Sequence, residues 1–236
     1  LTGFSAAGIT VHEAGDDNKE ETLDGFAWSL RLRALMEVAH NLTEARSFWE
    51  STNNTLGINH GIGSASDPGF LALETRAGYT AYFEDNDPRE AAANVNGTHY
   101  GFPLQDAVWR TNHPYDPEFI KTMKGHPEVS GDSETRYILL HDTFKLYETN
   151  KTLIGPLQAV NVTAVVGDKG GTDRSSFVTC GEVASASGEN ILSVSYEPAQ
   201  QTMYLAFENG WSNDTKHTPA SCNNYIHLDM APYFAI

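Results

Sequence analysis

Apolar and polar positions alternate along this chain with two different periods, and each period predicts its own kind of element. Between Phe26 and Ala39 the apolar residues form two helical stripes, at positions 26, 30, 34 and 38 and at positions 28, 32, 35 and 39. A helix that is apolar over so much of its circumference is buried between other layers. Arg31 and Arg33 lie between the stripes, and we expect both to be solvated.

Shorter runs alternate with a period of two, which is typical of half-buried strands. These runs predict strands over 4–14, 58–64, 69–76 and 79–84, and a hairpin made by Ile191–Tyr196 and Gln201–Phe207. Further helical signals lie at 44–52 (with Thr43 as its cap), at Pro117–Met123 and at 132–149, and 153–166 is either a short helix or a loop. Residues 89–103 and 209–236 look irregular. Helices between groups of strands, without repeats or a linker, predict a single α+β domain over 1–236.

The stretch from Val108 to Tyr137 carries the most chemistry. Ala107-Val108-Trp109 looks like the end of a strand, and Pro114 stops it because proline cannot donate to a sheet ladder. Asn112 then lies at a strand exit. An amide NH₂ fixed at such a place can donate to an oxygen that gains charge in a reaction.

Arg136 is the second unusual residue of this stretch. Asp132 or Ser133 is a good N-cap, so Arg136 is expected in the first helical turn, where the helix dipole disfavours a cation. Two explanations stay open: a salt bridge to a nearby carboxylate, or a contact with substrate in the transition state.

Three motifs together resemble one family. They are Thr-Asn-His-Pro at 111–114, Ser-Glu-Thr-Arg-Tyr at 133–137, and Gly-Phe-Ser-Ala-Ala-Gly-Ile-Thr-Val at 3–11. In this order the chain resembles the N-terminal-nucleophile amide hydrolases and acyltransferases that use cysteine. The family includes penicillin V acylase, bile-salt hydrolase, the fungal penicillin acyltransferases and the acid-ceramidase-like proteins of protists.

The resemblance implies a fold, a reaction and roles for particular residues. The fold would be a four-layer αββα sandwich, and the reaction would be acyl transfer at a linear carboxamide C–N bond. The Asn112 side chain and the backbone N–H of Ser5, which stands where the family often has Asn, would form the oxyanion hole, and Arg136 would be the active-site arginine. Phe4 and His113 would contact the substrate. The substrate would be a small amide or a lipid amide of ceramide-like type.

The resemblance also implies a nucleophile that these residues do not include. The family's N-terminal cysteine lies upstream of the region that matches 1–11, whereas Cys180 and Cys222 lie far beyond the motifs. We therefore expect a companion N-terminal segment that begins with cysteine and packs against residues 1–11.

Two other functions stay open at this point. A secreted glycoprotein could keep the fold without the nucleophile. A serine esterase of the Gly-Asp-Ser type could use Ser133 with Asp214 and His217. That family needs its serine directly after a strand, and His126-Pro127-Glu128-Val129 is a poor strand.

Charge and composition narrow the choice of partners. The formal net charge of −16 argues against nucleic acid and against anionic membrane surfaces, both of which select cationic proteins. No stretch reaches the roughly 18 apolar residues of a membrane span. Neither a His-Glu-x-x-His nor a Cys-x-x-Cys motif is present, so we expect no metal site and no cofactor.

Sequons and cysteines indicate the cellular compartment. The sequence has glycosylation sequons at Asn41, Asn53, Asn96, Asn150, Asn161 and Asn213. They favour the secretory pathway, with a lysosomal, vacuolar or extracellular destination, and Asn41 and Asn96 lie in predicted loops. In such a compartment Cys180 and Cys222 would form a disulfide, and two free buried thiols are the alternative.

Overall fold

The structure is a computed structural model that describes residues 1–67, 69–124, 132–166, 190–209 and 218–234. The chain divides into two compact units, Leu1–Val129 (unit 1) and Ser130–Ile236 (unit 2). Both combine helices with antiparallel sheets, which agrees with the predicted α+β class.

Unit 1 is built on a five-stranded antiparallel sheet in the order β1-β2-β3-β4-β5. Its strands are β1 (Thr2–Phe4), β2 (Ile9–Gly15), β3 (Ile58–Ser64), β4 (Phe70–Arg76) and β5 (Tyr79–Phe83). The predicted strands at 58–64, 69–76 and 79–84 are thereby confirmed. Consecutive strands are neighbours throughout, so the sheet is a simple meander.

The single strand predicted over 4–14 is wrong, because a tight turn divides it into β1 and β2. The Gly8 N–H donates to the Ser5 carbonyl (2.9 Å), and the Ser5 N–H donates to the Ile9 carbonyl (2.9 Å). Gly8 has φ +80°, in the left-handed region that favours glycine. The turn lets Phe4 pair with Thr10 and Thr2 with His12.

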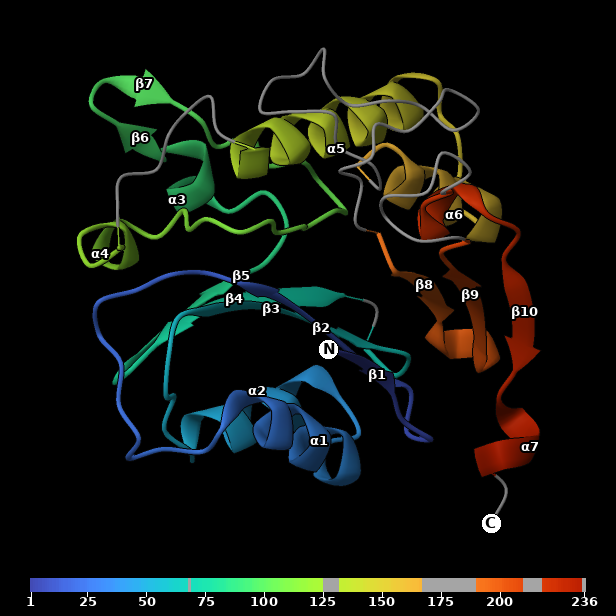
Figure 1. The fold of residues 1–236 in the computed structure, drawn as a ribbon, viewed down its shortest axis with the longest axis horizontal. Helices are drawn as coiled ribbons and strands as arrows, with labels where there is room; N and C mark the ends of the chain where they lie inside the picture. The colour runs from blue at the N-terminus through green and yellow to red at the C-terminus, as the bar shows by residue number, and fades with distance from the viewer. Residues whose placement is uncertain (68, 125–131, 167–189, 210–217, 235–236) are drawn as a thin grey trace. The chain divides into compact units, whose positions relative to one another are not determined.

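Helices α1 (Trp28–Val38) and α2 (Leu42–Glu50) cover one face of this sheet (Figure 1). Their apolar residues and the sheet form one core, whose most buried members include Ile9, Val11, Leu32, Leu35, Trp49, Ile62 and Leu73. The cap of α2 is Asn41 rather than Thr43, since the Asn41 Oδ1 accepts from the Glu44 N–H at 2.7 Å. A helix in this place is confirmed, but it is not buried between two layers. Leu32 and Leu35 lie in the core, whereas Leu30 and Val38 of the other predicted stripe are exposed.

Arg31 corrects the expectation of a solvated side chain, because it is only 1% exposed. Its guanidinium donates to the Thr52 hydroxyl (2.7 Å) and to the Thr52 carbonyl (2.8 Å), and it also bonds to the Trp49 carbonyl and to Asn54. The Trp49 carbonyl belongs to the last turn of α2 and the Thr52 carbonyl lies just past it, where a cation is favoured by the helix dipole. Arg33, by contrast, is exposed and pairs with Glu37.

The opposite face of the sheet carries the segment from Pro88 to Ile120. It contains α3 (Pro88–Ala91), β6 (Asn94–Val95), β7 (Thr98–His99) and α4 (Pro117–Ile120). Residues 89–103 are therefore not irregular as predicted. Asn96 and Gly97 have φ +52° and +88°, the conformation that a two-residue hairpin loop requires. The predicted strand end at 107–109 is absent: in this part of the described chain only an isolated bridge joins Leu104 to Ala107.

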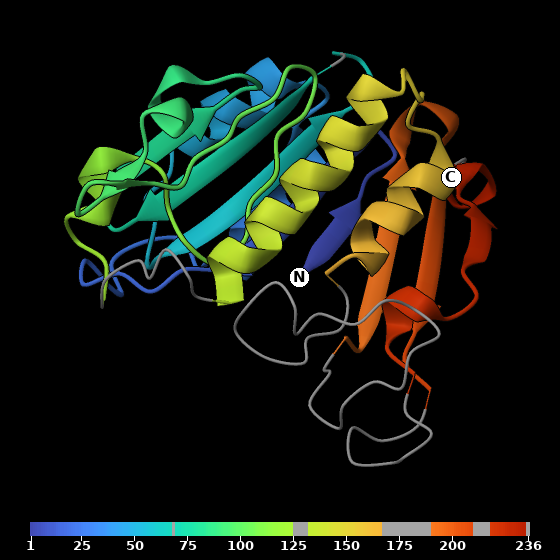
Figure 2. The same cartoon turned by 90° about the horizontal axis from the view of Figure 1, so that it is seen from above.

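Unit 2 contains two helices and a three-stranded antiparallel sheet in the order β10-β9-β8. Its elements are α5 (Asp132–Thr149), α6 (Pro156–Ala164), β8 (Leu192–Glu197), η2 (Pro198–Gln200), β9 (Thr202–Phe207), η3 (Ala220–Cys222), β10 (Ile226–Asp229) and α7 (Ala231–Phe234). The helix at 132–149 and the hairpin are confirmed, whereas β10, η3 and α7 replace the irregular tail. Figure 2 shows α6 lying against β8. The hydroxyl groups of Thr163, Ser193 and Tyr225 are hydrogen-bonded to one another.

None of the helices in the described residues combines the length and the apolar character that a membrane crossing needs.

Candidate functional site

Asn112 lies over the sheet face that α1 and α2 leave open. Its side chain is exposed, and its Nδ2 donates to the carbonyl of Gly15 at 2.7 Å. Gly15 is the last residue of β2, so the amide is anchored at a strand end.

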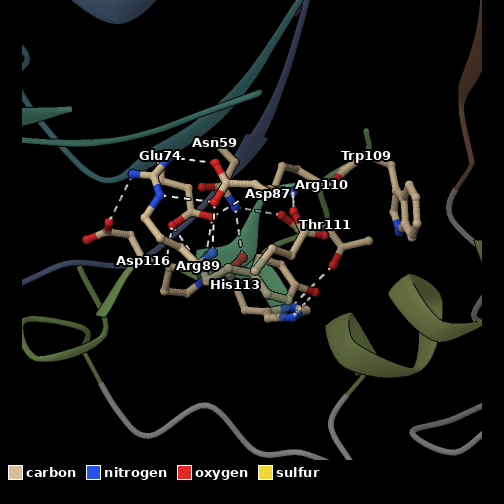
Figure 3. A network of polar contacts seen from close by, with 12 residues as sticks. Asn59, Glu74, Asp87, Arg89, Trp109, Arg110, Thr111, His113 and Asp116 are labelled. Carbon is tan, nitrogen blue, oxygen red and sulfur yellow. Dashed lines mark hydrogen bonds and ion pairs between the residues drawn. The ribbon is translucent and has the colours of Figure 1, made fainter. Parts of the chain in front are cut away.

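Asn59 fixes the backbone on both sides of Asn112. It lies in β3, its side chain is 0% exposed, and its Nδ2 donates to the carbonyls of Thr111 (2.8 Å) and His113 (3.1 Å). Figure 3 shows Asn59 next to the Thr111–His113 backbone. A single amide group thus holds the backbone on either side of Asn112.

Glu74 of β4 holds the neighbouring backbone. Its carboxylate accepts from the backbone N–H groups of Tyr115 (2.9 and 3.0 Å) and Asp116 (2.8 Å), and from Arg110 Nε at 3.0 Å (Figure 3). Arg110 also pairs with Glu90 at 2.9 Å. These side-chain contacts take the place of a strand ladder, which explains why residues 107–116 lie on the sheet without forming a strand.

The charged side chains that hold this segment are buried. Glu74, Glu90 and Arg110 have almost no exposed side-chain surface. Burial raises the pKa of Glu74 to about 7, while Arg110 and the two backbone N–H groups oppose that shift. The Arg110 guanidinium also lies over the rings of Phe83 (4.4 Å) and Tyr115 (4.9 Å).

A second chain of contacts continues from Asp116. Its carboxylate accepts from the Tyr79 hydroxyl at 2.9 Å and lies 3.6 Å from Arg89, which also pairs with Asp87 (2.8 Å). Burial, followed by the bond to Asp116, raises the pKa of Tyr79 to about 12. The contacts tie the start of α4 to β5 and α3.

His113 is a core residue in this structure. It is 2% exposed, its Nε2 lies 2.6 Å from the Tyr115 hydroxyl, and its Nδ1 lies 3.2 Å from the Thr111 hydroxyl. Its ring also packs against Tyr100, with 5.6 Å between the ring centroids. The structure therefore does not support the predicted substrate contact of His113.

Ser5 and Asn112 are not brought together. Ser5 lies beside Ile9, at the start of β2, whereas Asn112 contacts Gly15, at its end. Six residues of strand separate these points, about 20 Å at the usual rise per residue. The Ser5 N–H is in addition bonded to Ile9, so the expected oxyanion hole of Ser5 and Asn112 is not formed.

The remaining predicted residues lie in different parts of the fold. Phe4 is half-buried in β1. A Cβ atom on the preceding Gly3 would meet Met36 of α1, so Phe4 faces the other side of the sheet. Arg136 is half-buried in α5 and has interaction partners. It is the fifth residue of that helix and so lies just past the predicted first turn. Ser133 is the second residue of α5, and Asp214 and His217 lie outside the described residues.

His60 lies on the helix-covered face of β3, next to Trp49 (4.8 Å between ring centroids). Among the described residues neither ring nitrogen has a hydrogen-bond partner. Burial, and then the charge of Arg31, lower the pKa of His60 to about 3. The ring is therefore neutral at neutral and mildly acidic pH.

The sequons that the structure describes all lie on the surface. Asn53, Asn96, Asn150 and Asn161 are exposed and Asn41 is half-buried. The fully buried asparagines, Asn18 and Asn59, belong to no sequon. Asn213 lies outside the described residues, and so does Cys180, so its pairing with Cys222 stays a prediction.

The sequence motifs single out Asn112 but do not indicate the residues that hold it. Glu74 lies between Leu73 and Thr75 in a period-2 pattern, which indicates that its side chain faces away from α1 and α2. The pattern does not indicate that this side chain is buried. Arg110 directly precedes the Thr-Asn-His-Pro motif, and this position in the sequence is the one feature that could have indicated its role. Among the described residues, no three His, Cys, Asp or Glu side chains gather closely enough to hold a metal ion.

A comparison with models of known protein families finds no family that matches this chain, and a comparison with curated proteins finds no relative.

Proposed function

We propose that the protein is an amide hydrolase or acyltransferase that cleaves linear carboxamide C–N bonds, with Asn112 as an oxyanion donor. The observation that supports this most is the anchoring of the Asn112 amide. Its side chain is exposed, yet it is bonded to Gly15, and the carbonyls on either side of it are bonded to Asn59. A donor held in place before reaction stabilises developing charge without reorganisation, and one such donor contributes about 3 kcal/mol.

The reaction would proceed through a thioester. The thiolate of an N-terminal cysteine, carried by the companion segment, attacks the carbonyl carbon, and its own α-amino group takes the thiol proton. The amine leaves with that proton, and water or a second amine then cleaves the thioester. Arg136 would orient the nucleophile or bind the substrate, and the fold would be the four-layer αββα sandwich of the family that the motifs resemble.

One observation favours the alternative of a non-catalytic glycoprotein. The Ser5 N–H, expected as the second donor, is used within the β1–β2 turn and lies about 20 Å of strand away from Asn112. The amidase proposal therefore needs its second oxyanion donor from elsewhere, and the companion segment is our candidate. The esterase alternative is weaker, since Ser133 lies inside α5 rather than directly after a strand.

We also propose a secretory, lysosomal or vacuolar location, supported by the surface position of the described sequons. A small amide or lipid amide would be the substrate.

The test is turnover of fluorogenic N-acyl amides by the native protein and by Asn112→Asp. We expect kcat/KM to fall at least about a hundredfold, because the carboxylate cannot donate and repels the oxyanion. Asn86→Asp, at another exposed asparagine of unit 1, is the matched control and should keep full activity. Unchanged turnover in Asn112→Asp would remove Asn112 from the mechanism, and no amide turnover by the native protein would favour the non-catalytic alternative.

A further inference from the structure

Asn59 is an unusual residue for the third strand of a five-stranded sheet. It is fully buried between Ala14 of β2 and Glu74 of β4. Its Oδ1 has no hydrogen-bond partner among the described residues. A buried acceptor without a partner destabilises a fold, and only the donor side of the same amide offsets this cost.

The donor side of the same amide is fully used, and both contacts go to one place. Nδ2 donates to the carbonyls of Thr111 and His113, the residues on either side of Asn112. Asn112 in turn donates to Gly15, whose neighbour Ala14 pairs with Asn59 across the ladder. The backbone before Asn112, the backbone after it and its side chain are thus all bonded to two adjacent strands.

We propose that Asn59 is a positioning residue that fixes the direction of the Asn112 amide; this rests on the proposed function of Asn112 as an oxyanion donor. Two bonds from a rigid strand prevent the 111–113 backbone from rotating, and that rotation would swing the side chain of Asn112. Small misplacements of a catalytic donor cost much activity, because the donor must meet the oxyanion at hydrogen-bond distance.

The test compares Asn59→Asp with a matched buried control. Asn59→Asp keeps the side-chain size but removes both N–H donors. Asn54→Asp does the same at another buried amide, whose Nδ2 donates to the Tyr79 carbonyl (2.7 Å) and the Thr80 hydroxyl (2.8 Å). We expect kcat to fall at least tenfold in Asn59→Asp, with KM within twofold, and to stay unchanged in Asn54→Asp. Asn59→Ser, which keeps one donor, should lie between Asn59→Asp and the wild type and covers the case that Asn59→Asp does not fold.

The double variant Asn59→Asp/Asn112→Asp identifies the route of the effect. If Asn59 acts through Asn112, its substitution should change kcat by less than twofold once Asn112 is replaced. A folded Asn59→Asp or Asn59→Ser protein with wild-type kcat, or a double variant whose losses multiply in full, would overturn the inference while leaving Asn112 in place. Wild-type turnover in Asn112→Asp would instead defeat the proposed function itself.

Discussion

At the scale of single residues, two ionisable side chains on neighbouring strands have opposite pKa shifts. Glu74 of β4 faces the site, and His60 of β3 faces the helices. The native pKa of Glu74 is raised to about 7, so native Glu74 binds more protons than the unfolded chain between about pH 4.5 and 7. The native pKa of His60 is lowered to about 3, so native His60 binds fewer protons than the unfolded chain between about pH 3 and 6.5. Acidification therefore stabilises the fold through Glu74 and destabilises it through His60.

We therefore predict that the contributions of Glu74 and His60 to the free energy of unfolding change by nearly equal and opposite amounts between pH 7 and pH 5. Each is worth about 2 kcal/mol over this interval. In His60→Leu the free energy of unfolding should rise on acidification, relative to the wild type, by about 2 kcal/mol. In Glu74→Gln the free energy of unfolding should fall on acidification, relative to the wild type, by about the same amount.

Urea unfolding at pH 5, 6 and 7 measures both differences. His40→Leu and Glu84→Gln are suitable controls, because both side chains are exposed. Parallel pH profiles of the wild type and His60→Leu would show that His60 is not held neutral by its surroundings.

At the scale of elements, the sequence predicts those whose periodicity is local. The strands β3, β4 and β5 and the β8–β9 hairpin have close to the expected bounds, because each alternates cleanly between turn signals. Helix α5 has the expected bounds as well, and its signal is a helical pattern that follows a capping residue. The β1–β2 hairpin was missed because its turn depends on Gly8, one residue within a continuous strand-like run. The tail was missed because β10 exists only by pairing with β9.

The candidate site shows the same limit. The Thr-Asn-His-Pro motif predicted that Asn112 would lie at a strand exit with its amide free. The structure instead places Asn112 on a segment that is not a strand and bonds its amide to Gly15. Glu74 and Asn59 lie roughly 40 to 50 positions before the residues they hold. Contacts over such separations leave no periodic trace in the sequence. His113 was misjudged because burial beside Tyr100 and Tyr115 is likewise decided by the tertiary fold.

At the scale of the whole molecule, the described sequons lie at the surface. Exposure is what a glycosyltransferase requires of its acceptor asparagine, and Asn96 meets this requirement at the tip of a hairpin loop.

We predict glycans on several sequons of the protein made in a secretory host, with Asn96 among the occupied sites. Endoglycosidase treatment should increase electrophoretic mobility, and Asn96→Gln should remove one step of the shift. The exposed Asn86, which belongs to no sequon, is the control, and Asn86→Gln should leave the pattern unchanged. An identical mobility before and after treatment would contradict the secretory location.

The central claim, amide cleavage through a cysteine and an oxyanion held by Asn112, is tested most directly by trapping the acyl intermediate. The native protein is mixed with an N-acyl amide, quenched in acid within its first turnovers, and its peptides are identified by mass spectrometry. We expect an acyl group in thioester linkage on the cysteine that begins the companion segment, and we expect it to accumulate much more slowly in Asn112→Asp. An acyl group on Ser133, or turnover in which no cysteine becomes acylated, would contradict it.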